Sequence, residues 1–423
     1  MKKNKYVIVA TCLIAPILAH LLLSKMYQKN IPMSQVIAYY TEWSVYDRSF
    51  YIEDVNAKKI TRLLYAFIKL EDNGQISIWD EYAALKKPMP SGGLGSFSSL
   101  EKLHQKSPDL GIGISIGGWT GSQNFHQLKN KALRDIFVSS LRDFMIKYPF
   151  FDCVDIDWEY PGLPGIGNKH GPEDSDTLSL IANDVRYMLN QLSTLNSRAY
   201  YLTLTIGGSV EALKYINFKL LSQVIDSFNI MAYDFHGAWD MKTGHYSPLY
   251  QYKSNINCID SAVNIMFKNA VPPHKIVIGV PFYGRSWSGL SGSNNPISSF
   301  AKEPGPGTWE IGVLDYKDIK KNFLSDSKFK TYYDKSSGSE YLFDGDTLIS
   351  YDSPETIKNK IKYAYDKKIA GIMVWELSAD NGDLINCIDN NISSIPRCYI
   401  PRPLIFIVIG VLLLLILFFI RRY

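Results

Sequence analysis

The sequence is poor in cysteine and lacks the closely spaced cysteines that structural metal sites and disulfide-rich folds require. Only five cysteines occur in 423 residues. None stands in a CxxC pair, and no cysteine–histidine spacing resembles that of a zinc site. Five cysteines in so long a chain also exclude a small scaffold held together by disulfides.

An excess of charge of one sign is lacking as well. Lysine and arginine number 45 against 41 aspartates and glutamates, and the basic residues are scattered rather than gathered in a stripe. The net charge of +4 therefore does not indicate nucleic-acid binding. Internal repeats and low-complexity tracts are absent from the sequence, and 46% hydrophobic residues allow a large core.

Aromatic residues are plentiful, at 13% of the chain with 28 tyrosines and 8 tryptophans. Flat aromatic side chains serve either as stacking surfaces for sugars or as ordinary core and surface residues. Composition alone leaves both interpretations open.

Two apolar segments stand at the ends of the chain. Tyr6–Ser24 follows three lysines, and Leu404–Ile420 is followed by two arginines. A membrane-spanning helix needs about 20 apolar residues, with a range near 17–25. We expect residues 1–30 to form a signal anchor or a signal peptide, and 401–423 a transmembrane helix with a short basic tail. The flanking basic residues predict that the region between lies in the lumen or outside the cell, in the secretory pathway.

That compartment is oxidising and permits disulfides. Cys387 and Cys398 are the best candidate pair, since they follow the last expected strand closely. Cys153 lies within an apolar run and is expected to be a buried hydrophobic residue.

The middle of the chain alternates between short β-branched runs and amphipathic stretches. Strands are expected at 35–41, 62–69, 111–117, 152–158, 200–206, 227–233, 276–282 and 370–376. Helices are expected at 125–147, 175–195, 255–269 and 353–367. Eight strands alternating with helices predict an α/β fold, the closed (β/α)8 TIM barrel. An open doubly wound sheet is the alternative, but no G-x-G-x-x-G loop follows the first strand.

The spacing breaks once, between the seventh and eighth strands. About 60 extra residues there are rich in glycine and tyrosine and predict a small inserted α+β subdomain over the barrel mouth. The expected domains are a catalytic barrel at 31–283 and 346–400, with the insertion at 284–345.

The run Phe151–Tyr160 is acidic on one face. Side chains alternate along a strand, so Asp155, Asp157 and Glu159 share one face, and the apolar residues between them face the helices. Three neighbouring carboxylates raise at least one pKa, which creates a general acid near neutral pH. Three carboxylates could alternatively bind Mg²⁺ or Ca²⁺.

The spacing Asp152-x-x-Asp155-x-Asp157-x-Glu159 resembles the DxxDxDxE motif of glycoside hydrolase family 18, the chitinases. Three other segments resemble family motifs at strand ends: Ser115–Gly118, Met231–Asp234 and Trp375. Finer matches resemble the bacterial-type subgroup with an insertion before the eighth strand: Glu42–Tyr46, Pro281–Arg285, Gly307–Glu310 and Trp375–Asp383. The resemblance covers about residues 34–390. Ser286 and His236 depart from the usual pattern of that subgroup.

The resemblance implies a substrate-assisted reaction with retention at the anomeric carbon. Glu159 would be the acid and base, and Asp157 would orient the acetamido group of the sugar. Asp155 would share a proton with Asp157, and Tyr233 would hydrogen-bond the acetamido oxygen.

The resemblance also implies a set of sugar-binding residues, in which Trp375 forms the floor under the sugar at the cleaved bond. The set comprises Trp375, Met231, Asp234, Tyr283, Arg285, Trp119, Trp43, Trp309, Glu310 and Trp239. The expected partner is chitin or chitooligosaccharides, with no nucleic acid, cofactor or metal, and the protein is expected to be monomeric.

Two other functions fit the same motif. One is an endo-β-N-acetylglucosaminidase acting on N-glycans, or a related enzyme of wall sugars. The other is a non-catalytic chitin-binding lectin. Such lectins usually lack the last carboxylate of the motif, whereas Glu159 is present here.

Overall fold

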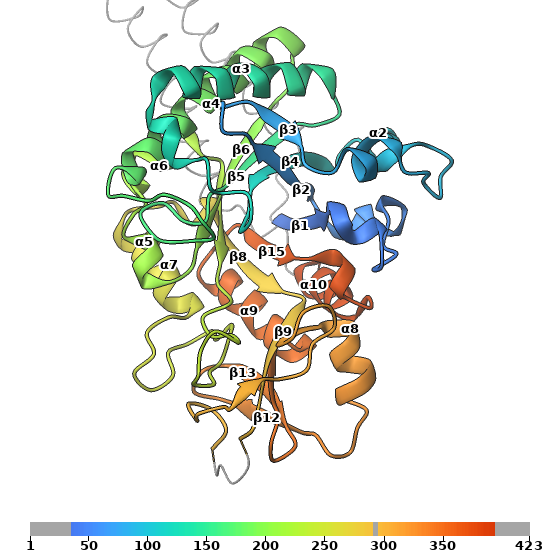
Figure 1. Ribbon diagram of the computed structural model, residues 1–423, viewed down its shortest axis with the longest axis vertical. Helices are drawn as coiled ribbons and strands as arrows, with labels where there is room; N and C mark the ends of the chain where they lie inside the picture. Colours follow the sequence, from blue (N-terminus) through green and yellow to red (C-terminus); the bar gives the residue numbers. More distant parts are fainter. Residues whose placement is uncertain (1–34, 291–294, 394–423) are drawn as a thin grey trace, which may run out of the picture. The chain divides into compact units, whose positions relative to one another are not determined.

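The computed structural model describes residues 35–290 and 295–393. Within them, parallel strands close into an eight-stranded barrel, because β1 pairs with both β2 and β15 (Figure 1). The barrel strands are β1 (Gln35–Thr41), β2 (Arg62–Leu70), β4 (Gly111–Gly117), β5 (Cys153–Asp157), β6 (Tyr201–Gly207), β7 (Ser227–Met231), β8 (Ile276–Pro281) and β15 (Gly371–Trp375). The short strand β3 (Ile76–Ile78) pairs antiparallel with the end of β2. Closure confirms the TIM barrel and excludes the open sheet.

All eight strands lie where the apolar runs predict them, with ends that differ by at most two residues. The largest difference is at β7, which ends at Met231 rather than at residue 233. The backbone turns there, since the Ala232 N–H bonds to the Ile230 carbonyl and Asp234 adopts a φ of 56°. Tyr233 and Asp234 therefore stand on a loop beyond the strand.

Helices cover the outside of the barrel. The longer ones are α2 (Gly95–Lys106), α3 (Lys131–Lys147), α4 (Asp174–Asn196), α7 (Ile259–Lys268), α9 (Pro354–Asp366) and α10 (Asp383–Ser393), and the shorter ones are α5 (Val210–Leu213) and α6 (Phe218–Val224). The expected helix at 125–147 is interrupted, because the Asn130 side chain caps α3 by accepting from the Ala132 N–H. The segment before it forms a short 3₁₀ helix, His126–Lys129.

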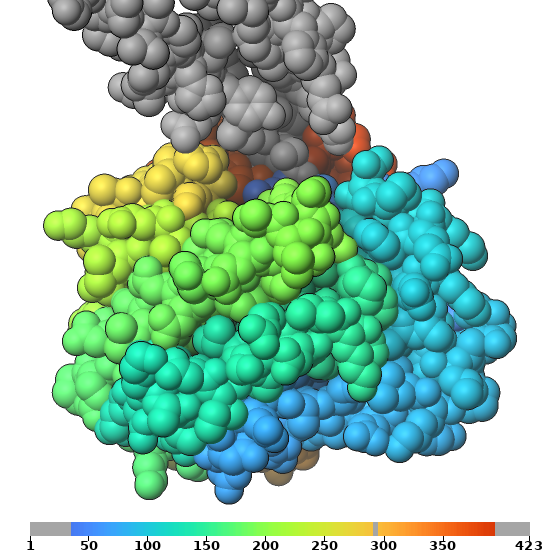
Figure 2. Space-filling view, turned by 90° about the horizontal axis from the view of Figure 1, so that it is seen from above, coloured from blue at the N-terminus to red at the C-terminus, as the bar shows by residue number. Residues whose placement is uncertain are grey.

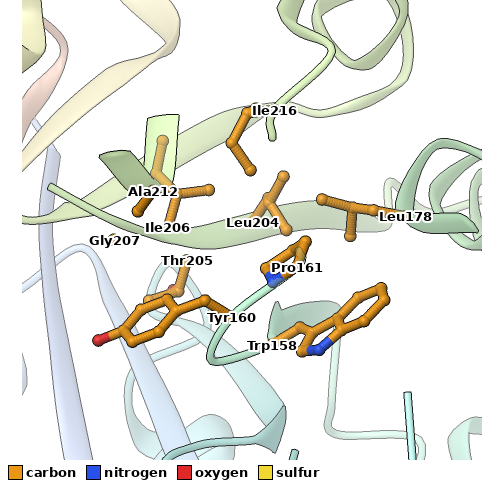
Figure 3. A pocket seen from close by; sticks show the side chains of 10 residues that line it. All are labelled: Trp158, Tyr160, Pro161, Leu178, Leu204, Thr205, Ile206, Gly207, Ala212 and Ile216. Carbon is orange, nitrogen blue, oxygen red and sulfur yellow. The ribbon is translucent and has the colours of Figure 1, made fainter. Parts of the chain in front are cut away.

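The apolar face of β5 fixes which way the acidic face points. Val154 and Ile156 are fully buried, and Trp158 stacks on Phe125 with ring centroids 5.4 Å apart. Figure 3 shows Trp158 close to Leu178 of α4, with Tyr160 pointing the opposite way. The residues between the apolar ones must then face the barrel interior. Figure 2 shows the part of the chain with α3 and α4, coloured cyan to green, spread over the outer surface.

A second sheet follows directly on β8. Its strands are β9 (Tyr283–Ser288), β10 (Glu303–Pro304), β11 (Val313–Asp315), β12 (Lys330–Asp334), β13 (Ser339–Phe343) and β14 (Leu348–Tyr351), and it also carries α8 (Tyr316–Asp318). All its pairings are antiparallel. Figure 1 shows this sheet, yellow to orange, beyond the end of β8. It lies where the insertion is expected, while the bounds 284–345 as a separate domain stay a prediction.

Three expectations fall on residues outside the described ranges. These are the segments 1–30 and 401–423 and the partner cysteine Cys398. Among residues 35–290 and 295–393, no helix is both long and apolar enough to cross a membrane. Cys387 lies on α10, where its thiol contacts the Pro354 carbonyl.

Candidate active site

The innermost carboxylate of the acidic strand, Asp155, is fully buried and held by hydroxyl groups from three other strands. Tyr39 and Ser115 donate to Oδ2 at 2.8 and 2.7 Å, and Thr203 donates to Oδ1 at 2.6 Å. Thr205 adds a longer bond at 3.1 Å. Burial raises the pKa of Asp155, and the hydrogen bonds from Thr203 and Ser115 oppose that rise. Asp155 is thus fixed in position.

Asp157, the middle carboxylate, is 3% exposed, and its Oδ1 atom has no hydrogen-bond partner among the described residues. Burial raises the pKa of Asp157 well above its ordinary value, and the charges of Glu159 and Asp155 raise it further. A buried carboxylate oxygen without a partner is costly. It is therefore a natural acceptor for a ligand N–H.

Glu159 stands just beyond the end of β5 and is 8% exposed. Its backbone N–H donates to Ser122 Oγ at 2.8 Å, and its carbonyl accepts from Asn168. Burial raises the pKa of Glu159 to about 7; a hydrogen bond from Tyr160 opposes this effect, and the charge of Asp234 adds to it. A carboxyl group with this pKa is half protonated near neutral pH, as a general acid requires.

Met231 and Tyr233 lie beside the carboxylates, on β7 and the loop after it. Both are buried in the apolar cluster that includes Tyr283 and Met373. The Tyr233 hydroxyl contacts Met373 Sδ at 3.9 Å, and burial raises its pKa well above the ordinary value. Tyr233 therefore remains a neutral hydrogen-bond donor.

Asp234, Tyr283 and Arg285 form one hydrogen-bonded group. Arg285 donates from Nε and Nη2 to the two carboxylate oxygens of Asp234, both at 2.8 Å. The Tyr283 hydroxyl donates to Asp234 Oδ2 at 2.7 Å. The Arg285 guanidinium also lies 4.8 Å from the ring centroid of Trp239, whose side chain is 60% exposed. The group joins the loop after β7 to β9.

Trp375, the last residue of β15, is the centre of an aromatic cluster. Its ring stacks on Phe67 at 5.6 Å and meets the edges of Tyr39 at 5.3 Å and Trp43 at 6.4 Å. Trp375 therefore stands, partly exposed, at the C-terminal end of the barrel, where TIM barrels have their active sites.

The remaining predicted site residues are exposed. Trp119 directly follows the end of β4 and lies 6.3 Å from the Tyr160 ring. Trp309 lies on the loop between β10 and β11 and donates its indole N–H to Asp315. Glu310 follows it, and its backbone bridges to Val313. Ring contacts thus join Trp43 to Trp375 and Trp239 to Arg285, whereas Trp309 contacts Asp315 instead.

Sequence reasoning missed several polar residues near the carboxylates, all of them buried except Tyr160, which is partly exposed. They are Tyr39, Thr203, Thr205, Asn229 and Tyr160, of which all but Tyr160 contact Asp155. Hydroxyls at alternate positions of an otherwise apolar strand are the available signal. Thr203 and Thr205 show it on β6.

The donors around Asp155 also bear on the alternative that the three carboxylates bind Mg²⁺ or Ca²⁺. Hydroxyl and amide groups occupy both oxygens of Asp155. Among the described residues, no group of three or more His, Cys, Asp or Glu side chains is arranged to hold a metal ion.

Comparison with known sequences decides the family. Residues 35–380 match Glycosyl hydrolases family 18. The chain belongs to this family. The protein is therefore a glycoside hydrolase, and the match includes its acidic strand β5.

Individual members agree with this assignment. The chitinase of Autographa californica nuclear polyhedrosis virus is 33% identical over 398 residues, which cover 84% of this chain and 71% of that protein. The structure of chitinase ChiA74 from Bacillus thuringiensis matches with a TM-score of 0.79 at 29% identity, covering 85% of this chain and 70% of that one. The Group IV chitinase of Ostrinia furnacalis in complex with allosamidin matches with a TM-score of 0.76 at 26% identity, covering 86% and 99%.

Proposed function

We propose that this protein is a chitinase that hydrolyses β-1,4 bonds between N-acetylglucosamine units, with Glu159 as acid and base. The observation that carries the proposal is the pair of neighbouring carboxyl groups at the end of β5. Glu159 has a pKa of about 7, and beside it Asp157 presents a buried oxygen without a partner. The relatives named above as chitinases support the same substrate class.

In the first step, the Glu159 carboxyl donates its proton to the glycosidic oxygen as the bond to the anomeric carbon breaks. The carbonyl oxygen of the sugar's own acetamido group attacks that carbon and closes an oxazolinium ring. Asp157 Oδ1 accepts the acetamido N–H, which orients the group and stabilises the positive charge that forms. Tyr233 donates a hydrogen bond to the acetamido oxygen.

In the second step, the Glu159 carboxylate removes a proton from water, and the water oxygen attacks the anomeric carbon. The bond from that carbon to the acetamido oxygen breaks as the new bond forms, so the oxazolinium ring opens and the acetamido group is restored. Two successive attacks on opposite faces leave the configuration retained. Asp155 shares a proton with Asp157, its neighbour on the inner face of β5. Its five donor residues keep this pair aligned for both steps.

The aromatic residues bind the sugar chain. Trp375 lies under the sugar at the cleaved bond, where its indole face suits the C–H face of a pyranose. Met231, Asp234, Tyr283 and Arg285 line the same part of the cleft. Glu310 adds a polar wall. The binding surface is extended to either side by four exposed tryptophans, Trp43, Trp119, Trp239 and Trp309.

The context of the enzyme is part of the proposal. The apolar segments at 1–30 and 401–423 support a chain attached to a membrane, with the catalytic barrel outside the cell or in the lumen of the secretory pathway. The antiparallel sheet between β8 and β15 supports the bacterial-type subgroup. We propose that the protein acts as a monomer.

The test is turnover by the full chain, purified in a mild detergent. Chitotetraose and a high-mannose N-glycan are offered as parallel substrates, and products are followed by mass spectrometry and by proton NMR within the first minutes. We expect chitobiose with the β-anomer formed first. Inverted product would contradict the mechanism, cleavage of the N-glycan alone would contradict the substrate, and binding of chitin without new reducing ends would identify a lectin.

A further inference from the structure

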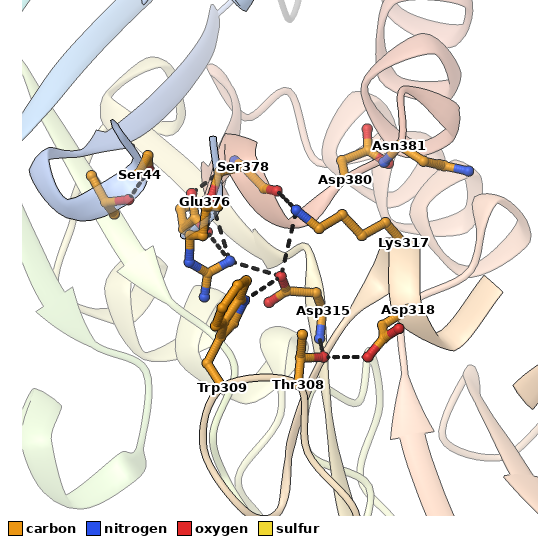
Figure 4. Close-up of polar contacts among 12 residues, drawn as sticks. Ser44, Thr308, Trp309, Asp315, Lys317, Asp318, Glu376, Ser378, Asp380 and Asn381 are labelled. Carbon is orange, nitrogen blue, oxygen red and sulfur yellow. Dashed lines mark hydrogen bonds and ion pairs between the residues drawn. The ribbon is translucent and has the colours of Figure 1, made fainter. Parts of the chain in front are cut away.

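Asp315 occupies an unusual position on the antiparallel sheet. It ends β11, lies opposite Tyr283 of β9, and is only 2% exposed. One of its oxygens, Oδ2, is the meeting point for side chains from separate parts of the chain, as Figure 4 shows. We call the group the Asp315 cluster; its members are Arg48, Trp309, Asp315, Lys317, Glu376 and Ser378.

Arg48 brings the loop after β1 into the cluster. Its Nη1 atom lies 2.7 Å from Asp315 Oδ2 and 3.3 Å from Glu376 Oε1. The same nitrogen donates to Ser378 Oγ at 3.3 Å. The guanidinium carbon also lies 5.1 Å from the ring centroid of Trp309. A planar cation suits this double role of pairing and stacking.

The other side of the cluster is the end of β15. Glu376, which follows the floor residue Trp375, accepts from the Ser378 N–H and hydroxyl at 2.8 Å each. Lys317 donates to the Ser378 carbonyl at 2.7 Å and lies 3.8 Å from Asp315 Oδ2. Two carboxylates are thus balanced by two cations, which makes a buried charged cluster tolerable.

Trp309 is the exposed member. Its side chain is 49% exposed, yet its indole Nε1–H donates to Asp315 Oδ2 at 2.9 Å. An exposed tryptophan normally samples several rotamers, and ordering it on binding costs free energy. The bond to Asp315 removes that cost in advance. The ring is therefore held ready to stack on a sugar.

We propose that Asp315 is a positioning residue that holds the Trp309 platform of the antiparallel sheet in register with the barrel floor at Trp375, and so sets the affinity for longer sugar chains. The proposal rests on the proposed function. Asp315 acts through Trp309 and Arg48 rather than on the reacting atoms. Among the described residues, no hydrogen bond or ion pair joins a member of the Asp315 cluster to Asp155, Asp157 or Glu159, so the chemical step itself is not its target.

The first test compares Asp315→Asn with the unaltered full chain on fluorogenic glycosides of chitobiose and chitotetraose. Asparagine removes the charge that holds Arg48 against the Trp309 ring, and it weakens the bond to the indole N–H because a neutral amide oxygen is a poorer acceptor than a carboxylate oxygen. We expect KM for the tetrasaccharide glycoside to rise about 3- to 10-fold, since one exposed aromatic side chain loses its preorganisation. We expect kcat to change less than about twofold and KM for the disaccharide glycoside to stay nearly unchanged. Equal losses on both substrates, or a loss in kcat alone, would overturn the proposal.

The second test is a double-mutant cycle with Trp309→Phe, which keeps a flat ring but has no N–H for Asp315. On that background Asp315→Asn should add less than about twofold to KM, because both changes act on the same interaction between Asp315 and Trp309. If the increase in KM of the double variant equalled the product of the two single increases, Asp315 would not act through Trp309. The matched control is Asp344→Asn, an exposed carboxylate of the same sheet that accepts from the backbone of its own turn, and it should leave KM unchanged.

Calorimetry separates this proposal from the proposed function. Chitotetraose is titrated into Glu159→Gln protein with and without Asp315→Asn, so that binding is measured without turnover. Weaker binding by the same 3- to 10-fold supports the positioning role even if the unaltered protein proves not to cleave chitin. Equal affinities would contradict it even if the unaltered protein cleaves chitin efficiently.

Discussion

Tyr39 and Asp155 lie 116 residues apart in the sequence, and the Tyr39 hydroxyl donates to Asp155 Oδ2 at 2.8 Å in the barrel interior. The edge of the same ring packs against Trp375 at 5.3 Å. One side chain of β1 therefore joins the row of carboxylates to the aromatic floor. Closure of the barrel through β1 produces this arrangement.

Replacing Tyr39 by Phe tests that link. The change removes one donor to a buried carboxylate, and hydrogen bonds to charged groups contribute about 1.5–3 kcal/mol. Asp155 then becomes harder to ionise and shares its proton less readily with Asp157. We expect kcat on chitotetraose to fall about tenfold with little change in KM. Tyr40→Phe is the control, since its hydroxyl points elsewhere and donates to the Phe50 carbonyl. Equal effects of the two changes would contradict the assignment.

The pH profile tests the protonation state of Glu159. The acid must carry its proton, so kcat/KM should be highest below the raised pKa of about 7 and fall as the pH increases through it. The charge of Asp234 contributes to the raised pKa. In Asp234→Asn the negative charge is gone and Arg285 loses its partner, so the falling limb should move to lower pH. A limb that stays in place, or moves to higher pH, would contradict this assignment.

Lys360 on α9 forms an ion pair in which both side chains are buried. Its ammonium group is fully buried, pairs with Asp352 and donates to Ser247 Oγ at 2.8 Å. Burial lowers its pKa. Lys360→Met leaves the Asp352 carboxylate buried without its cation, which should cost about 3–5 kcal/mol of unfolding free energy. Urea denaturation followed by tryptophan fluorescence measures the loss.

The same helix offers the control for that measurement. Lys362 pairs with Asp366 four residues along, but its side chain is 73% exposed. Lys362→Met should therefore change the unfolding free energy by less than about 1 kcal/mol. If Lys360→Met cost no more than Lys362→Met, the buried pair would not be a stabilising element.

Much of the fold is predictable because the strands are short apolar runs with clear boundaries. The acidic face of β5 is predictable too, since Val154 and Ile156 fix the register and leave Asp155, Asp157 and Glu159 facing inward. The end of β7 is not, because the backbone turns at Ala232 through a local hydrogen bond that leaves no mark in the hydrophobic pattern.

Contacts between distant segments are the part that the sequence does not predict. The donors around Asp155 come from four strands, and only barrel closure brings Tyr39 next to Thr205. Arg48 and Asp315 are 267 residues apart, and neither belongs to a motif with a fixed spacing. Pairing of this kind depends on where the antiparallel sheet lies against the barrel.

The most direct test of the central claim is the activity of Glu159→Gln. The amide keeps the shape and the polar contacts of the side chain but cannot donate the proton. We expect chitotetraose hydrolysis to fall at least about 100-fold, with binding retained. Glu173→Gln, an exposed position that pairs with Lys129, should keep full activity. Glu159→Gln protein that released chitobiose at the normal rate would contradict the account, because the proton would then have to come from another group.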